Sequence, residues 1–178
     1  MPSIAFSRSV SLTIIAEGGE LYTQTKGDAG GATKFGISIA TLSAYRNATC
    51  TPSDVKNMMR AEAEAIYFSR YWLPIRADEY GSDALAASVF DCGVLTGTAN
   101  AARMLQAAVG ATVDGNIGPK TLAAVRESDN LAVMRTFSAA WQAYLIAIVQ
   151  RDATQAQFLI GWLRRAASMQ AYFFLFNR

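Results

Sequence analysis

Apolar residues near the start of the chain recur at the spacing of one helix face. The positions on this face are Phe6, Val10, Ile14 and Glu17. Gly18 and Gly19 follow at once, and glycine ends helices because it accepts a positive φ. The pattern therefore predicts a helix whose apolar stripe ends in the carboxyl of Glu17.

The stretch that follows, residues 20–38, is rich in glycine and threonine and has no helical rhythm. Within it, Lys34-Phe35-Gly36-Ile37 is predicted as a strand of a small β-hairpin. Helical spacing dominates the rest of the chain. The fold class predicted is therefore mainly α with a small β-hairpin near the N-terminus.

Downstream of the hairpin, the run 51–54 is typical of a helix start. Thr51 can cap the helix, Pro52 suits its first position, and Asp54 stands three residues after the cap. This helix is predicted to run to Trp72, before Pro74. Further helices are predicted over 83–95, 99–108, from 120, over 131–151 and over 154–167. The apolar tail 172–176 is expected to pack as helix, with contact to a membrane surface as the alternative.

Size and composition fit one substantial domain. The chain has 178 residues, of which 52% are hydrophobic and 17% charged, enough for a buried core. The longest uninterrupted apolar run, 143–149, is far short of the ~20 residues of a membrane span. Residues 8–17 do not fit a secretory signal, because Ser11 and Thr13 interrupt them. We expect no stable membrane span.

The absence of histidine excludes several kinds of site. Ser-His-Asp and Cys-His nucleophiles need it, as do many zinc sites. Cys50 and Cys92 are predicted to be free thiols rather than a disulfide. Catalysis, if present, would then rest on carboxylates, hydroxyls, amides or lysine, and we expect no metal or cofactor.

The net charge of +2 is too small to indicate nucleic acid. Residues 130–178 are more basic, with five arginines against Asp152 alone. A solvated helical face explains this excess, and attraction to an anionic polymer such as a cell wall is the alternative.

Glu17 is the first candidate for chemistry. It ends an apolar face at the negative end of a helix dipole, and both partial burial and the dipole favour a protonated carboxyl, as a general acid requires. An exposed, frayed helix end is the alternative.

The nearby Asp28-Ala29-Gly30-Gly31-Ala32-Thr33 adds a carboxylate, two glycines that allow close approach, and a hydroxyl that could hold a water. These groups suit glycoside hydrolysis, although an ordinary tight turn has the same composition.

The sequence closely resembles the N-acetylmuramidases of glycoside hydrolase family 108, which are bacteriophage and prophage lysozymes with bacterial relatives once labelled secretion activators. The blocks that carry the resemblance, in order, are Glu17-Gly18-Gly19; Asp28-x-Gly30-Gly31-x-Thr33-Lys34-Phe35-Gly36-Ile37-Ser38; Ile66-Tyr67; Arg70-Tyr71-Trp72; Phe90-Asp91; Val113 to Leu122; and Phe158-Leu159-x-Gly161-Trp162-Leu163. They span nearly the whole chain. The block from Asp114 to Leu122 resembles a peptidoglycan-binding signature.

The resemblance implies a lysozyme-like fold that cleaves the β-1,4 link from N-acetylmuramic acid to N-acetylglucosamine. It implies Glu17 as the catalytic acid, with Asp28 and Thr33 beside it. Residues 1–98 would form the catalytic region and 99–178 a helical region resembling a peptidoglycan-binding module, in one continuous globule. Inverting, retaining and lytic transglycosylase routes all remain open at this point. A wall-binding or secretion-accessory protein with little turnover is the competing hypothesis.

The substrate-binding candidates are Gly30, Gly31, Tyr71 and Asp91. Tyr71 could stack on a sugar or pack in the core. Asp91, on a helix that is apolar nearly all round, needs a partner such as Arg70 or Arg103, or else lies beneath the sugar cleft. Asp114 and Gly115 are expected to shape a turn rather than to bind wall peptide.

Two departures from the family pattern fall in the expected cleft floor. Leu95-Thr96-Gly97 stands where relatives often have Asn-His-Gly, and Arg164 stands where they tend to have Asn. The expected partner is a peptidoglycan glycan strand, with no nucleic acid, and the protein is expected to be a monomer. It would be made in the cytoplasm and reach the wall after holin-type release.

Overall fold

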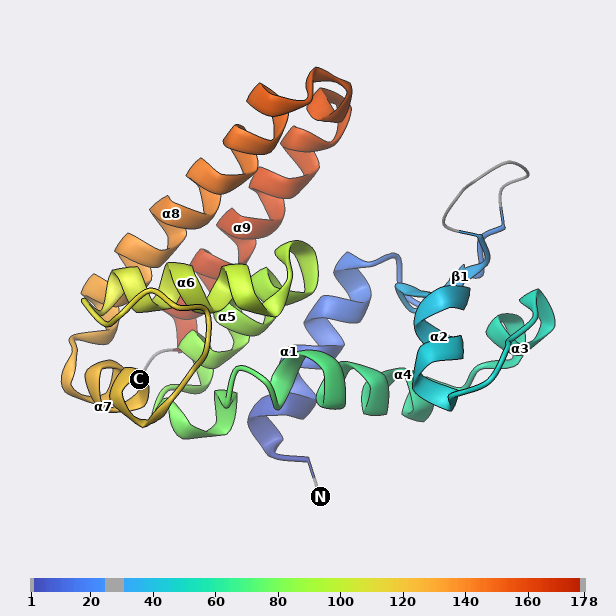
Figure 1. The fold of residues 1–178 in the computed structure, drawn as a ribbon, viewed down its shortest axis with the longest axis horizontal. Helices are drawn as coiled ribbons and strands as arrows, with labels where there is room; N and C mark the ends of the chain where they lie inside the picture. Colours follow the sequence, from blue (N-terminus) through green and yellow to red (C-terminus); the bar gives the residue numbers. More distant parts are fainter. Residues whose placement is uncertain (1, 25–30, 177–178) are drawn as a thin grey trace.

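Two groups of elements of unequal size make up the structure (Figure 1). This computed structural model describes residues 2–24 and 31–176. The larger group, the helical body, contains α1 (Ile4–Ala16), α5 (Asp83–Thr96), α6 (Thr98–Ala108), α7 (Pro119–Glu127), α8 (Asn130–Arg151) and α9 (Ala156–Phe176). The smaller group, the hairpin lobe, contains β1 (Thr33–Lys34), β2 (Ile37–Ser38), α2 (Ile39–Arg46) and α3 (Pro52–Asn57).

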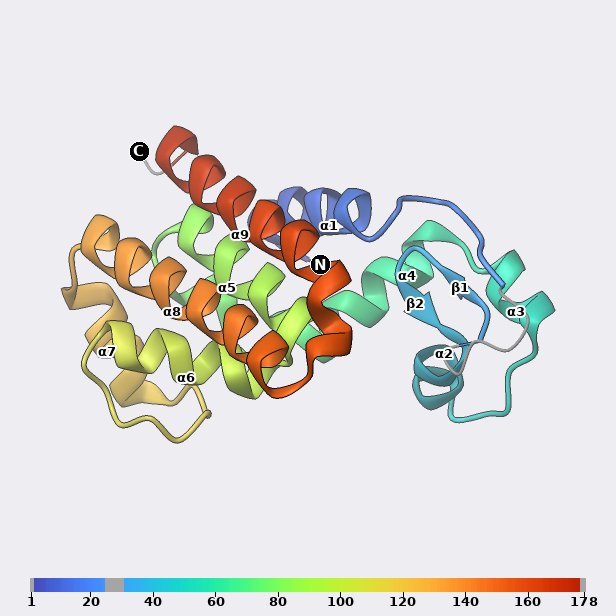
Figure 2. The ribbon, with the colours of Figure 1, turned by 90° about the horizontal axis from the view of Figure 1, so that it is seen from above.

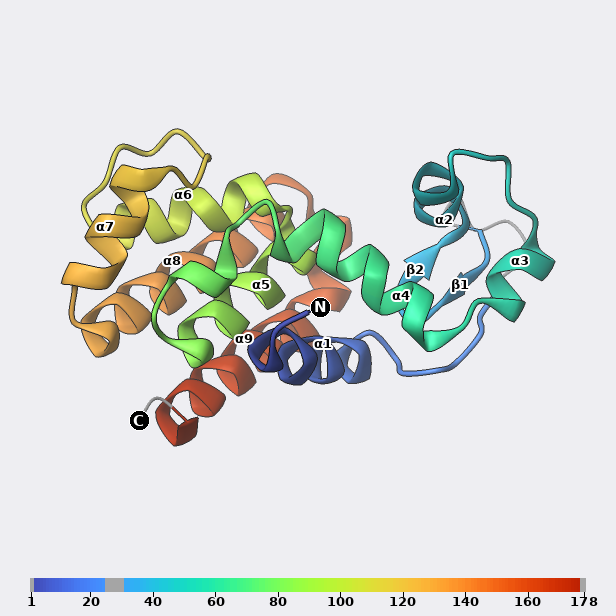
Figure 3. The same ribbon diagram turned by 90° about the horizontal axis from the view of Figure 1, so that it is seen from below.

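The two groups are joined by α4 (Arg60–Tyr67) and by the segment that follows α1 (Figure 3). A five-residue π-helical turn (Phe68–Trp72) continues α4 into the body, and two short 3-10 turns cover Ala77–Glu79 and Ala153–Gln155. The described residues thus confirm a mainly α fold with one small hairpin.

Helix α5 forms the centre of the helical body. Its residues from Ala84 to Gly93 are all buried, as its apolar sequence predicted. Helices α1, α6 and α9 contact it (Figure 2). Its Phe90 ring meets Phe6 of α1 and Trp72 edge-on, at centroid distances of 6.1 and 5.4 Å. One hydrophobic core therefore includes residues from both sides of position 98.

Helices α8 and α9 form a long antiparallel pair (Figure 1). By length and composition alone, α8 could cross a membrane, since an 18-residue window has a mean hydropathy of 1.3. Its Phe137, Trp141 and Leu145 are buried, and the helix packs on α6 and α9. The apolar tail is the last part of α9, which confirms helix there. Phe173 is buried, while Phe174 and Phe176 are exposed.

The strand predicted over 34–37 is in fact a hairpin turn. Lys34 pairs with Ile37 and Thr33 with Ser38, so Phe35 and Gly36 are the two turn residues. Both have a positive φ, 54° and 75°, which matches the twist that two-residue hairpins need. The Phe35 ring is buried, and this burial explains why a bulky residue occupies a position that favours glycine or asparagine.

The helix predicted from Thr51 to Trp72 is interrupted. It begins with the predicted capping box, but α3 ends at Asn57, and Met58 and Met59 are extended. The Lys34 ammonium donates to the carbonyls of Lys56 and Met58, both at 2.9 Å, so a cation from the hairpin caps the end of α3. This contact comes from a distant segment, which is why local spacing did not predict the break.

Candidate active site

Glu17 stands at the end of α1, where the sequence predicted it. Its backbone N–H donates to the Thr13 carbonyl at 2.9 Å, and Gly19 donates to Ile14 at 2.8 Å. Gly18 and Gly19 have φ values of 97° and 66°, so the chain leaves the helix axis there. The Glu17 side chain is 26% exposed and points away from the core of the body.

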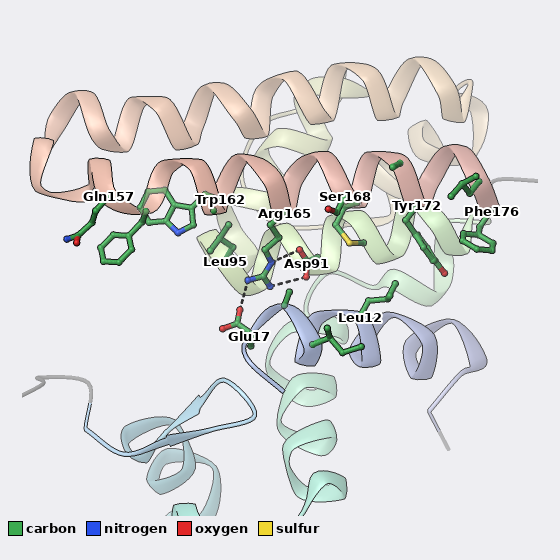
Figure 4. Close-up of a pocket in the computed structure, with 17 residues that line it drawn as sticks. Leu12, Glu17, Asp91, Leu95, Gln157, Trp162, Arg165, Ser168, Tyr172 and Phe176 are labelled. Atoms are coloured by element: carbon green, nitrogen blue, oxygen red, sulfur yellow. Dashed lines mark hydrogen bonds and ion pairs between the residues drawn. The ribbon is translucent and has the colours of Figure 1, made fainter. Parts of the chain in front are cut away.

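A groove of about 920 Å³ lies between α1 and α9, and Glu17 lines it (Figure 4). Helix α5 forms its floor through Asp91 and Leu95. Near Glu17 the groove is lined from α9 by Gln157, Phe158, Gly161, Trp162 and Arg165. Leu95 stands at one of the positions where the sequence departs from the family pattern, and this departure faces the groove.

Arg165 connects the two acidic residues of the groove. Its Nε and Nη2 donate to Asp91 at 2.7 and 2.9 Å, and its Nη1 donates to Oε1 of Glu17 at 2.5 Å (Figure 4). Thr13 donates to Asp91 as well, at 2.7 Å. Helices α1, α5 and α9 each supply part of this network, so the packing of the body fixes the orientation of the Glu17 carboxyl.

The network has more negative than positive charge. Asp91 and Arg165 form a two-pronged ion pair, with side chains only 1% and 12% exposed. Burial would lower the pKa of Arg165, but the hydrogen bonds and charge of Asp91, together with the charge of Glu17, outweigh burial and raise it. Arg165 is therefore a permanent cation, and it has two carboxylate partners, Asp91 and Glu17.

The turn of the hairpin packs against Glu17 from the other side. A Cβ atom on Gly36 would stand 2.7 Å from Cβ of Glu17 and 2.6 Å from the Tyr67 hydroxyl, so only glycine fits there. That hydroxyl donates to the Phe35 carbonyl at 2.9 Å. Burial and the charge of Glu17 raise the pKa of Tyr67, so the hydroxyl stays protonated. Glu17 thus lies between the hairpin turn and Arg165.

Of the other predicted site residues, the structure describes only some. Asp28 and Gly30 lie outside the described residues. Thr33 begins β1, and its backbone pairs with Thr23 in both directions at 2.9 Å. Gly31 has a φ of 68°, as its place in a glycine-rich turn predicted. Tyr71 is partly buried against the core, and its ring lies 5.8 Å from that of Tyr67.

Asp91 has the buried, paired environment that its sequence position requires, but the partner proposed from sequence was wrong. Arg165 pairs with it, rather than Arg70 or Arg103. Arg165 is the functional residue that sequence reasoning missed. It lies four residues after Gly161 of the Gly-Trp-Leu block, inside the arginine excess attributed to a solvated face. No local pattern separates it from its neighbour Arg164, which is exposed.

The block from Asp114 onward serves a turn, as predicted. Gln106 is fully buried, and its amide donates to Asp114 at 2.7 Å and to the Asn116 carbonyl at 2.9 Å. Gly115, with a φ of 84°, donates its N–H back to the Gln106 side chain at 2.8 Å. These bonds hold the loop between α6 and α7, so Asp114 already has a structural role.

Neither cysteine lines the groove. Cys50 and Cys92 are free and buried, which confirms the prediction that they do not pair. Burial raises the pKa of Cys92 to about 12, so its thiol is a poor nucleophile. Among residues 2–24 and 31–176, no three Asp, Glu or Cys side chains are grouped closely enough to hold a metal ion.

Comparisons with known proteins match both halves of the chain. Residues 10–97 match the family model described as glycosyl hydrolase 108, and residues 100–167 match one described as a predicted peptidoglycan domain. Among solved structures, that of Brucella abortus SagA is similar, with 32% sequence identity and a TM-score of 0.83. The likeness covers 97% of this chain and 95% of the SagA chain. A comparison with curated proteins gave no match.

Proposed function

Since the chain belongs to the glycosyl hydrolase 108 family and is a peptidoglycan hydrolase, we propose that it cleaves the β-1,4 bond between N-acetylmuramic acid and N-acetylglucosamine, with Glu17 as general acid. The observation that carries this proposal is the position of the Glu17 carboxyl. It lines the groove between α1 and α9, packed against Gly36 of the hairpin on one side and hydrogen-bonded to Arg165 on the other. Among the described residues, no other carboxylate of the groove is exposed, since Asp91 is buried.

The charge arrangement suits a proton donor. A general acid must carry a proton in the Michaelis complex and give it to the leaving glycosidic oxygen. Asp91 already neutralises Arg165, so Glu17 can take up a proton without leaving a buried charge unpaired. After proton transfer, the Arg165 guanidinium stabilises the new Glu17 carboxylate through the bond at Oε1.

A water must attack the sugar from the other face. We propose that Thr33, helped by Asp28, holds or activates this water, which gives an inverting reaction. Thr33 is in β1, and the turn of the same hairpin contacts Glu17, which supports the placement of Thr33 near the groove. In inverting enzymes the two carboxyl groups are roughly 6.5–9.5 Å apart, against 5–5.5 Å in retaining ones.

Of the other candidates for glycan binding, Asp91 lines this groove, whereas Gly31 and Tyr71 are not part of its lining. We propose that Gly30 and Gly31 let a sugar approach the backbone and that Tyr71 borders the substrate path. Asp91 affects substrate binding only by positioning Arg165, because both of its carboxylate oxygens already accept hydrogen bonds from Arg165 and Thr13. The protein is proposed to act as a monomer without metal or cofactor.

Product analysis with a Glu17→Gln variant tests the proposal. Purified peptidoglycan is digested with either protein, and the new sugar ends are identified by mass spectrometry. Wild type should produce reducing N-acetylmuramic acid ends, and Glu17→Gln should be slower by about 10²–10⁴-fold, the usual contribution of a general acid. Glu20→Gln is the matched control, because Glu20 is exposed three residues away and does not line the groove.

Each alternative gives a different product pattern. Equal turnover by wild type and Glu17→Gln contradicts the assignment of the acid. Anhydro sugar ends instead of reducing ends indicate a lytic transglycosylase. Binding to the wall without turnover by either protein indicates the accessory role.

We also propose that the enzyme is a phage endolysin that reaches the wall after holin-type release. This proposal rests on the resemblance of its first motif block to phage and prophage lysozymes. Expression in a bacterial host with and without a holin tests it. Lysis that requires the holin supports it, and equal lysis without the holin contradicts it.

A further inference from the structure

The first turns of α9 carry two aromatic rings that face the groove. We call Gln157, Phe158, Gly161 and Trp162 the aromatic face of α9; all four line the groove (Figure 4). The Phe158 and Trp162 rings are nearly parallel, with an interplanar angle of 29° and centroids 5.8 Å apart. Phe158 is 48% exposed, so its ring is open to a ligand in the groove.

The aromatic face and the catalytic groups share one side of the helix. Phe158, Trp162 and Arg165 are spaced i, i+4 and i+7, so they point in the same direction over two helical turns, roughly 10 Å. Arg165 ends this row with its bond to Glu17. A ligand that reaches Glu17 along α9 from the N-terminal end of the helix therefore passes over Phe158 and then Trp162.

Gly161 is a second, independent observation. A glycine inside a helix weakens it, and most such glycines make room for a packed neighbour. At Gly161 an added Cβ would meet no atom within 4 Å, and its φ is not in the left-handed region. Neither backbone strain nor packing within the chain explains the glycine. The position lines the groove and is open, so a ligand can approach the helix backbone there.

We propose that the aromatic face of α9 is a saccharide subsite, on which one hexosamine ring of the glycan strand stacks. This proposal rests on the proposed function. It adds that residues 157–162, within the segment matched by the predicted peptidoglycan domain, hold part of the substrate. A pyranose ring has an apolar face of C–H groups, which suits aromatic rings, and polar groups at its edge. Gln157 lines the groove next to Phe158; its amide donates to the Thr154 carbonyl at 3.3 Å and has a second N–H and an oxygen for such edge groups. The open space at Gly161 admits the ring.

Intrinsic fluorescence gives a direct measurement, since the three tryptophans differ in environment. Trp72 and Trp141 are fully buried, so Trp162 is the one that lines the groove. The Glu17→Gln protein is titrated with soluble glycan strands of alternating N-acetylglucosamine and N-acetylmuramic acid, freed of peptide. Binding should shift the Trp162 emission to shorter wavelength. In the Glu17→Gln protein, the further change Phe158→Ala removes one ring. It should weaken glycan binding about tenfold or more, as expected for an aromatic side chain that the ligand buries.

Gly161→Ala separates a binding role from a structural one, because the two effects have opposite signs. Alanine in the open helical position should raise the Tm by about 2–4 °C. Its methyl group would at the same time obstruct the sugar and weaken glycan binding about tenfold. Ile160→Ala is the matched control, since Ile160 is 64% exposed on the same helix and does not line the groove. It should bind like the parent protein.

The failure of this subsite and the failure of the proposed function give different results. If wild type cleaves glycan but Trp162 emission does not respond, and Phe158→Ala and Gly161→Ala bind like the parent, the subsite is wrong and the hydrolase proposal stands. If glycan binds with the expected sensitivity to Phe158 and Gly161 but wild type releases no sugar ends, the subsite stands and the catalytic proposal is wrong.

Discussion

The helical body and the hairpin lobe each contain an arginine bonded to two carboxylates. In the body, Arg165 donates Nε and Nη2 to Asp91 and Nη1 to Glu17. Its side chain is 12% exposed and that of Asp91 1%. These groups come from helices far apart in the sequence and are enclosed by packing.

In the hairpin lobe, Arg46 repeats the same bonding pattern at the surface. Its Nε and Nη2 donate to Glu62 at 2.8 Å each, and its Nη1 donates to Asp54 at 3.5 Å. The three side chains are 25–40% exposed. Here the hydrogen bond from Arg46 is the main reason that the pKa of Glu62 is lowered.

The two clusters show that bonding geometry alone does not determine function. Water screens the surface cluster and can replace any lost partner, so its contribution is small. In the body, a lost partner leaves a charge that water reaches poorly. The buried cluster can therefore fix the position of the Glu17 side chain, whereas the exposed one can only tie α2 to α3 and α4.

Asp91→Ala should lower the stability of the protein more than any change in the surface cluster does. It leaves the buried Arg165 with one of its three hydrogen bonds and Thr13 without its acceptor, which should lower the free energy of unfolding by about 3 kcal/mol. Urea denaturation followed by far-UV circular dichroism measures this change. The double variant with Arg165→Met should recover much of the loss, because it removes the unpaired charge. A double variant no more stable than Asp91→Ala would contradict this account.

Asp91→Asn changes the charge and keeps the shape. Arg165 would then have only Glu17 as counter-charge, and its hydrogen bonds to a neutral amide would be weaker than those to a carboxylate. Because Arg165 also holds the Glu17 side chain, we expect glycan hydrolysis to slow by about tenfold, equivalent to about 1.4 kcal/mol. Digestion of purified peptidoglycan by wild type and variant measures the rate. A wild-type rate in a variant that folds normally would mean that Asp91 has no influence on the groups around Glu17.

Arg46→Ala makes the matching change at the surface. Because the cluster is exposed, the Tm should fall by about 2 °C or less and glycan hydrolysis should keep the wild-type rate. Differential scanning calorimetry and the peptidoglycan assay measure the two quantities. A loss as large as that of Asp91→Ala would remove the contrast between the clusters.

Glu62→Gln should have the smallest effect on stability, and this effect should depend on pH. Since the pKa of Glu62 is lowered in the folded protein, its ionised form contributes stability above the unfolded value near 4.5. This contribution disappears as the pH falls through the lower, folded pKa. The variant should therefore be slightly less stable than wild type at pH 7, with a gap that closes in acid. Thermal melts at pH 3–7 in low and high salt measure it.

Local features of the chain were predicted well because they depend on near neighbours. Apolar spacing predicted helix α1, and the glycine pair predicted that it ends just before Gly18, with Glu17 at its end. The capping box at Thr51 formed as expected. The buried helix α5 was evident because an all-round apolar sequence has no solvent face.

Features that depend on distant segments were missed. The Lys34 ammonium ends α3, and the buried ring of Phe35 moves the hairpin turn, yet neither contact has a local signal. Arg165 and Glu17 are 148 positions apart, and one sequence gives no means of pairing them. The arrangement of residues around Glu17 therefore depends on how the helices pack, and no sequence motif describes it.

That separation has a consequence for the order in which the protein is made. Glu17 leaves the ribosome early, but the cation that holds it is residue 165 of 178, so a growing chain has the acid long before its partner. The contact between Glu17 and Arg165 can only form after α9 docks on α1 and α5, a late, long-range step in folding. A chain cut short before α9 would contain the whole segment matched by the glycosyl hydrolase 108 model and still lack this arrangement.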